Sequence, residues 1–209
     1  MSSSRITDSI AEFTLTIAED RIRSFFHLLQ QGFMVKAKVG CTIKEMFCHQ
    51  FGISPEYLEG RIQTIFLDGK AVDDAGAAMV RDGSALALSA AMPGLVGATF
   101  RKGGYLASFR SQITHAPDDL FAQRQDGNIT IKIFNLLLQE MGPPFLSRGI
   151  IIRREVLGDF LRQQPTPFWA GIKTATLDGQ AVALREILEE DWSGKQIQYA
   201  RLRVHTANE

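Results

Sequence analysis

The sequence predicts an α+β protein of two tandem domains, each a mixed sheet with one packed helix, joined by a Gly-rich connector. The prediction rests on the length, the composition and an internal repeat of the 209-residue chain. Such a length is comfortable for two domains of about 100 residues each. Hydrophobic residues make up 45% and charged residues 22%, close to the average of folded proteins and far from the signature of disorder. We therefore expect a folded chain.

The internal repeat is the most informative feature of the sequence. The segment 62–73 reads IQTIFLDGKAVD and the segment 172–183 reads IKTATLDGQAVA, so seven of twelve positions are identical. A second match at nearly the same offset pairs Leu28-Leu29-Gln30 with Leu137-Leu138-Gln139. Because order and spacing are both preserved, we predict two diverged copies of one unit. The expected bounds are 10–92 for copy one, 93–126 for the connector and 127–206 for copy two.

Copy one contains alternating and helical hydrophobic patterns in a set order. Thr42 and Glu45 have the spacing of a capping box at a helix start. Asp68-Gly69 is a dipeptide typical of a tight hairpin turn. The patterns predict strands at 33–39, 64–67 and 84–90, a short return strand from Ala71, and a helix at 42–51.

Copy two repeats this order. Ile152, Val156 and Phe160 recur at helical spacing, at the offset that relates the Leu-Leu-Gln matches. Asp178-Gly179 is the second hairpin dipeptide. The predicted strands lie at 129–134, 149–152, 174–177 and 196–204, and the helix between the second and third strands packs on one face of the sheet.

Three short segments resemble the β-grasp, or ubiquitin-like, superfamily, and within it the thiamine and molybdopterin sulfur-carrier proteins. They are GCTIKEM at 40–46, FLDGKAV at 66–72 and DGSAL at 82–86. The resemblance covers roughly 24–90 and, more weakly, 129–204. It implies two tandem β-grasp-like domains. It also implies that a carrier-like role would need cleavage after Gly104, because those carriers act through a free C-terminal Gly-Gly.

Charge and cysteine usage restrict the classes of partner. Lys plus Arg and Asp plus Glu each number 23, so no net field indicates binding to nucleic acid or to an anionic membrane. Cys41 and Cys48 lie seven residues apart in a predicted helix, too far to form a disulfide. The opening MSSSRITDSIAEF lacks the charged and apolar regions of a secretory signal. We therefore expect a cytoplasmic protein.

The connector is the candidate site for an anionic ligand. Glycine backbone N–H groups and nearby cations can hold a phosphate or carboxylate, although the pattern is neither a Walker A loop nor a G-x-G-x-x-G fingerprint. A connector that is ordered and packs on one or both domains, or on a partner, is the structural alternative, because its aromatic content does not suit disorder. The candidate ligand-binding residues are Gly94, Gly97, Arg101, Lys102, Gly103, Gly104 and Arg110.

The cysteines and histidines of the sequence do not form a pattern typical of a metal site or a catalytic triad. Cys41, Glu45, Cys48 and His49 could gather metal ligands on one helical face, but no second ligand pair is visible, and Cys48 suits the margin of a core. His27, His115 and His205 are scattered, and their spacing suggests no triad. We therefore expect no metal, no cofactor and no catalytic residues.

Three hypotheses of function follow. The favoured one is a non-enzymatic protein-binding or adaptor module that engages another protein, because β-grasp units expose sheet faces and edges. The alternative is a protein that binds a small anionic ligand at the connector. The third is a processed, sulfur-carrier-like protein ending at Gly104. Intact mass distinguishes the third, and a thermal shift with anions distinguishes the second.

Overall fold

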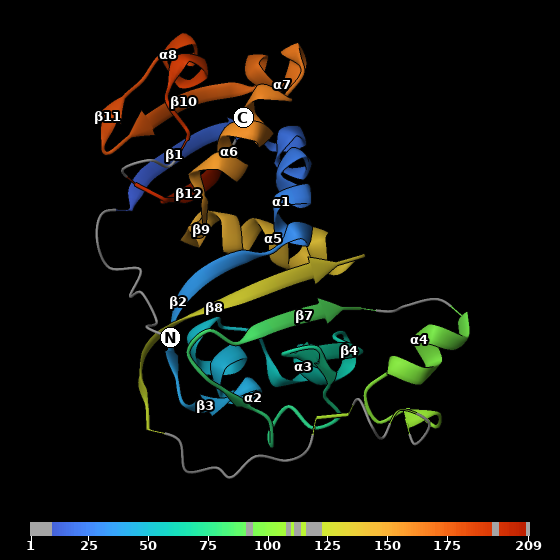
Figure 1. Ribbon diagram of the computed structural model, residues 1–209. Coiled ribbons are helices and arrows are strands. Elements are labelled where there is room, and N and C mark those ends of the chain that lie inside the picture. Colours follow the sequence, from blue (N-terminus) through green and yellow to red (C-terminus); the bar gives the residue numbers. More distant parts are fainter. Residues whose placement is uncertain are drawn as a thin grey trace. The chain divides into compact units, whose positions relative to one another are not determined.

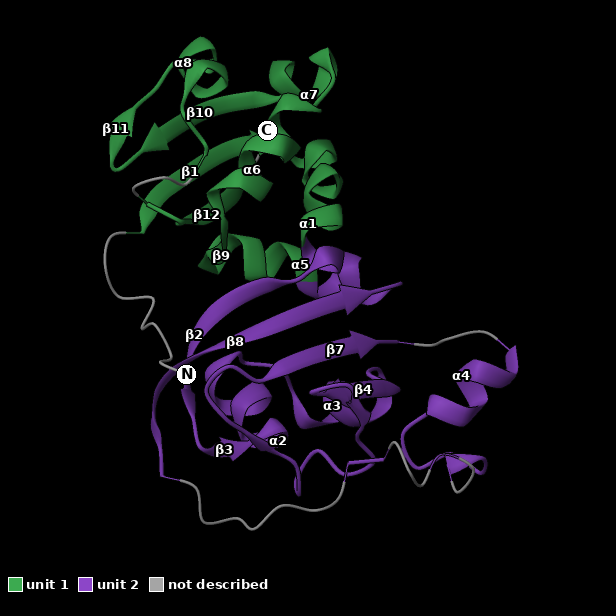
Figure 2. Cartoon of the chain, viewed as in Figure 1, with its two compact units in different colours: residues 1–28, 142–209 green, residues 29–141 purple. Residues whose placement is uncertain are grey.

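The computed structural model describes residues 10–90, 94–107, 110, 114–115, 123–193 and 197–207. It confirms the α+β class, with mixed sheets and several helices (Figure 1). The chain forms two compact units, and Figure 2 colours them separately. Unit 1 consists of Met1–Leu28 and Gly142–Glu209, and unit 2 consists of Leu29–Met141.

The sheet of unit 1 has five strands with a parallel pair inside it. Strand β1 runs parallel to β12, from Ala11↔Ala200 to Ala18↔Ala207. All other neighbours are antiparallel. The spatial order is β11 (Gln180–Ala181), β10 (Ile172–Leu177), β1 (Ala11–Ala18), β12 (Tyr199–Ala207) and β9 (Ile150–Arg153).

The sheet of unit 2 has the same pattern of strand directions. Strand β7 runs parallel to β8, and the remaining pairs are antiparallel. A separate two-stranded sheet pairs β3 (Cys41–Thr42) with β6 (Met79–Val80). The order of the main strands is β5 (Lys70–Ala71), β4 (Thr64–Leu67), β7 (Ala85–Ser89), β8 (Gln125–Phe134) and β2 (Phe33–Val39).

The helices are short. Unit 1 has a 3₁₀ segment η1 (Glu19–Phe25), α6 (Arg154–Arg162), α7 (Thr166–Ala170) and α8 (Leu184–Glu189). Unit 2 has α2 (Ile43–Glu45), the π-helical turn η2 (Met46–Gln50), α3 (Pro55–Gly60) and α4 (Gly94–Phe100). The unit boundaries fall within α1 (Phe26–Gln31) and α5 (Leu137–Arg148). Within the described ranges, no helix is both long and apolar enough to cross a bilayer.

Each unit has its own hydrophobic core. In unit 1 alternate residues of β1, from Ala11 to Ile17, are buried, and the rings of Phe25, Phe160 and Phe168 meet at centroid distances of 5.1 to 5.9 Å. In unit 2 alternate residues of β2 are buried in the same way. This period of two is what a half-buried strand requires, and it fixes the register of both strands.

Two aspartates at the hairpin turns have left-handed backbone. Asp68 has φ 50° and Asp178 has φ 49°, and each is followed by a glycine with φ 80° or 81°. Positive φ at both central residues makes a type I′ turn, whose twist matches that of the flanking strands. The predicted Asp-Gly hairpins are therefore confirmed at β4–β5 and β10–β11.

Each of these aspartates also fastens a neighbouring strand. The Asp68 carboxylate accepts a hydrogen bond from the Ala85 N–H at 2.7 Å, and the Asp68 N–H donates to the Ala85 carbonyl at 2.8 Å. Asp178 makes the same two bonds with Glu12, both at 2.8 Å. Strand β1 therefore occupies in unit 1 the position that β7 occupies in unit 2.

Most predicted elements are present, with differences that have physical causes. The expected strands at 33–39, 64–67 and 174–177 match β2, β4 and β10 closely. The helix expected at 42–51 begins with the predicted Thr42–Glu45 capping box, but it widens into a π-helical turn after Glu45. Strand β1 was not predicted, and residue 196 of the last predicted strand lies outside the described residues.

The compact units do not follow the expected bounds of 10–92 and 127–206. Strand β1 lies in unit 1, although it falls within the first range, and β8 lies in unit 2, although most of it falls within the second. The parallel pairs cause this difference, because β1 joins β12 and β8 joins β7. Descent of the two units from one duplicated ancestor stays a prediction.

Replacement of Asp178 by alanine is expected to destabilise the protein by about 1–3 kcal/mol. The variant loses the acceptor for the Glu12 N–H and places a Cβ-bearing residue without a local hydrogen bond in left-handed backbone. Asp178→Asn is the matched control, since asparagine tolerates this backbone and accepts the same bond. Urea unfolding measures both variants, and an equal loss in the two would contradict this role of the carboxylate.

Candidate functional site

The Gly-rich connector is anchored on the rest of unit 2 by a carboxylate of the chain itself. The Gly103 N–H donates to Asp73 Oδ1 at 2.8 Å, and the Arg110 guanidinium donates to the same oxygen at 2.6 Å. These are the kinds of donor that the sequence predicted for an external anion. Asp73, which sequence reasoning did not single out, supplies the negative charge.

Arg110 is the most buried cation of this cluster. Its side chain is 1% exposed, and it also donates to the Thr99 carbonyl at 2.7 Å and to Thr114 Oγ1 at 2.9 Å. A buried charge is tolerated only when it is paired and hydrogen-bonded, as it is here. Arg110 therefore holds together parts of the connector that precede and follow it in the chain.

Lys102 also binds to residues of unit 2 that lie outside the connector. Its ammonium donates to the Leu58 carbonyl at 2.9 Å and lies 3.1 Å from a carboxylate oxygen of Glu59, with only 8% of the side chain exposed. Arg101 is exposed, and its side chain has no hydrogen-bonded partner among the described residues. An anion that used all three connector cations would have to displace Asp73, so the connector ligand site stays a prediction.

The glycines of the connector have separate roles. Gly94 has φ 70° and begins α4, and Gly103 has φ 59° in the turn that reaches Asp73. Gly97 is buried in α4, and a Cβ at Gly104 would lie 3.1 Å from the Arg101 carbonyl. The structure thus brings Gly103 and Arg110 together on Asp73, whereas a Cβ at Gly94 would meet no other atom within 4 Å.

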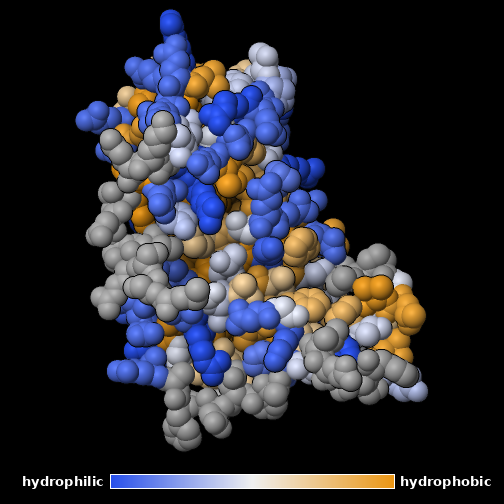
Figure 3. Space-filling view, in the orientation of Figure 1, coloured by the Kyte–Doolittle hydropathy of each residue, from blue (hydrophilic) through white to orange (hydrophobic). Residues whose placement is uncertain are grey.

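The outer face of α4 presents large apolar side chains to solvent. Leu95 is 75% exposed, Val96 is 56% exposed and Tyr105, in the following turn, is 96% exposed. On the inner side Phe100 packs on Phe66 with ring centroids 5.2 Å apart. Figure 3 shows hydrophobic atoms gathered over this segment. We call Leu95, Val96 and Tyr105 the α4 apolar surface.

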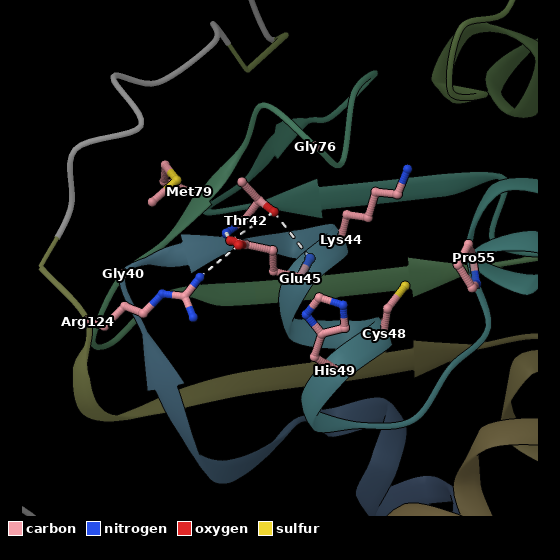
Figure 4. Close-up of a pocket in the computed structure, with 10 residues that line it drawn as sticks. All are labelled: Gly40, Thr42, Lys44, Glu45, Cys48, His49, Pro55, Gly76, Met79 and Arg124. Carbon is pink, nitrogen blue, oxygen red and sulfur yellow. Dashed lines mark hydrogen bonds and ion pairs between the residues drawn. The ribbon is translucent and has the colours of Figure 1, made fainter.

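A second candidate site is a pocket of about 510 Å³ in unit 2, where the chain enters α2. Figure 4 shows side chains projecting from α2 and η2 on one wall, with Arg124 reaching in from the residue before β8. The lining combines cations, one carboxylate, a thiol and apolar groups. The ten lining residues are Gly40, Thr42, Lys44, Glu45, Cys48, His49, Pro55, Gly76, Met79 and Arg124.

The carboxylate of this pocket is fully engaged. Glu45 Oε2 accepts the Thr42 N–H at 3.0 Å, and Oε1 accepts the Arg124 guanidinium at 2.7 Å (Figure 4). The bond from the Thr42 backbone and the nearby Arg124 charge lower the pKa of Glu45. Lys44 and His49 have no hydrogen-bonded or ion-paired side-chain partner among the described residues, so their donors face the pocket lining and solvent.

Both cysteines of the chain are partly or fully buried free thiols. Burial raises the pKa of both Cys41 and Cys48, which keeps the thiols protonated near neutral pH. Cys41 lies outside the pocket lining and donates to the Lys38 carbonyl at 3.2 Å. In the described part of the chain no group of three or more His, Cys, Asp or Glu side chains could hold a metal ion.

One Ser–His contact was not visible in the sequence. Ser147 Oγ lies 3.3 Å from His205 Nδ1 in unit 1. Both residues are exposed, and no carboxylate among the described residues orients the imidazole, so the pair lacks the third group and the enclosed setting of a triad. The contact joins the end of α5 to β12, residues 58 apart in the sequence, which spacing alone could not reveal.

Comparison with known proteins returns no relative. No family model, no curated protein and no solved structure matches this chain.

Breaking the Asp73–Arg110 pair is expected to lower the free energy of unfolding by on the order of 3 kcal/mol. Asp73→Ala leaves a buried guanidinium without a counter-charge and removes the acceptor of the Gly103 N–H. The double variant Asp73→Ala, Arg110→Met should recover part of this loss, because the unpaired charge is then gone. Chemical denaturation of these two variants and of the single variant Arg110→Met checks this, and strictly additive losses would refute the pairing.

The cap at Glu45 is expected to make stability sensitive to acid. Because its pKa is lowered in the folded state from an ordinary 4.5, the carboxylate contributes stability above that value. The contribution is lost as the pH falls through the lower folded-state pKa. Glu45→Gln, which keeps an oxygen acceptor, should show a flatter decline of stability between about pH 5 and pH 3. Urea midpoints across this range measure it; unchanged slopes would exclude the linkage.

Proposed function

We propose that this protein is a non-enzymatic binding module that docks another protein on the α4 apolar surface. The observation that carries the proposal is the exposure of Leu95, Val96 and Tyr105 on one ordered segment. Single exposed apolar residues are common, but several large exposed apolar groups within one short segment, here α4 and the turn after it, are typical of interaction sites.

The way α4 is held in place supports a role for its outer face. A helix of seven residues is marginal in water on its own, so its order depends on tertiary anchors. Phe100, Lys102 and Arg110 provide them by packing on Phe66, Leu58 and Asp73. A surface whose backbone is already fixed loses little conformational entropy on binding, which favours affinity.

The charges near this surface indicate the chemistry of the partner. Helix α4 contains no charged residue, and the exposed Arg101 follows it directly. The complementary surface is therefore an apolar segment with an acidic side chain at one end. Helix α4 of a second copy offers no acidic side chain to Arg101, so a contact between two α4 helices leaves this charge without a partner from the opposing helix.

We propose further that both units are β-grasp-like, as the sequence resemblance implies. Two observations support this: the same pattern of strand directions in both sheets, and the Asp68 and Asp178 turns that fasten equivalent strands. Under this proposal unit 1 takes β1 in the position where unit 2 uses β7. Function does not follow from such a fold, and the binding proposal rests on the α4 apolar surface alone.

The test compares two double variants in affinity capture from a cell extract. Leu95→Ser, Tyr105→Ser removes the α4 apolar surface, and Leu184→Ser, Leu188→Ser removes exposed leucines of α8 as a matched control. A protein captured by the wild type and the α8 variant, but not by the α4 variant, is then purified and titrated by calorimetry. We expect the α4 variant to weaken its Kd by at least about tenfold.

Two results would overturn this proposal. One is a set of captured proteins that the α4 variant retains in full. The other is a wild-type dimer in sedimentation that only the α4 variant abolishes, since the surface would then bind a second copy of the chain.

A further inference from the structure

We infer that the pocket at the start of α2 in unit 2 binds a small organic oxyanion through Lys44, His49 and Arg124. This site is separate from the α4 apolar surface and from the connector glycines. Its volume of about 510 Å³ lies in the range of pockets that hold small ligands.

The charge balance of the pocket favours an anion. Lys44 and Arg124 contribute +2 and Glu45 contributes −1, so the lining carries +1 with His49 neutral and +2 with His49 protonated. Glu45 is already bound to the Thr42 N–H and to one Arg124 nitrogen, so a ligand meets little of its charge. The remaining Arg124 donors can bind a carboxylate or phosphate, and the long Lys44 side chain, which extends away from Arg124 in Figure 4, can turn its ammonium toward the same group.

The other walls indicate that the ligand also has an apolar part. Met79 and Pro55 line the pocket beside the Cys48 thiol, which its partly buried setting keeps neutral. An inorganic ion would make no contact with these apolar groups, whereas the carbon skeleton of an organic phosphate or carboxylate would pack against them. The shared chemistry is an oxyanion on a compact organic body.

Unit 1 offers an internal contrast at the same point of the repeat. Arg154, which the repeat aligns with Glu45, is buried, donates to Glu190 Oε1 at 2.6 Å and stacks on Trp192 at 5.2 Å. The pocket there is about 240 Å³ and is lined by Arg153 and by the acidic Glu155. The larger pocket with the excess of cations is therefore a property of unit 2.

The experiment is an NMR titration of the full ¹⁵N-labelled chain with inorganic phosphate, citrate and adenosine monophosphate, with chloride at matched ionic strength as the blank. We expect saturable shifts at the amides of Thr42, Lys44 and His49, with a Kd of about 1 mM or tighter for at least one probe. Lys44→Gln and Arg124→Gln should each weaken that Kd by about fivefold or more.

Two further variants sharpen the result. Arg101→Gln is the matched control, because it removes an exposed cation outside the pocket and should leave the Kd unchanged. Glu45→Gln should tighten binding, since it removes the negative charge of the lining and weakens the attraction that holds Arg124 to residue 45. The dispersed spectrum of each variant verifies its fold.

The probes also separate the sources of the oxyanion. Binding of phosphate and adenosine monophosphate alone assigns the site to phosphate esters, binding of citrate alone assigns it to carboxylates, and binding of all three supports the shared chemistry. Absence of saturable shifts with every probe would overturn the inference, as would equal losses in the Arg101 and Lys44 variants.

Discussion

The structure depends on a parallel pair of strands inside each sheet, a pairing that no local turn can produce. Parallel neighbours need a long crossover connection, whereas antiparallel neighbours can be joined by a hairpin. In unit 2 the pair is β7 and β8, so the chain must travel from Ser89 to Gln125 before it returns to the sheet. The connector is this crossover. The Asp73–Arg110 pair and the bond from Lys102 to the Leu58 carbonyl fix the position of its described residues on unit 2. The α4 apolar surface exists because the crossover is long enough to contain a helix.

Local features of the fold could be read from the sequence because their causes are local. The alternation of β2, the capping box at Thr42 and the Asp-Gly turns each depend on a few adjacent residues. The assignment of strands to units could not be read, because it depends on pairs such as Phe13 with Leu202 and Leu86 with Ile131. A period-two pattern identifies a strand and its buried face, but it does not predict which other strand pairs with it. The π-helical widening after Glu45 likewise has no sequence signal that we can name.

The partners of charged side chains in the candidate sites likewise could not be predicted from the sequence. Gly103, Arg101 and Arg110 were sensible anion ligands by residue type, yet Asp73 already binds two of these donors from 30 and 37 residues away. The sequence indicates only one wall of the pocket at α2, the helical face that carries Glu45, Cys48 and His49. Arg124, which lies 79 residues from Glu45, completes the pocket. A net charge of zero does not reveal such groupings, because it sums all side chains of the protein, whereas a binding site depends on the few charged side chains that lie close together.

The pairing of β1 with β12 has a consequence for how the protein is made. A ribosome delivers β1 before unit 2, but β12, the strand that lies parallel to β1, emerges only after the whole of unit 2. Unit 2, by contrast, is one continuous stretch of chain, so all of its strands are present once Phe134 has left the exit tunnel. During translation unit 2 can therefore fold as a nascent domain, while β1 has no parallel neighbour in unit 1 until β12 has been synthesised.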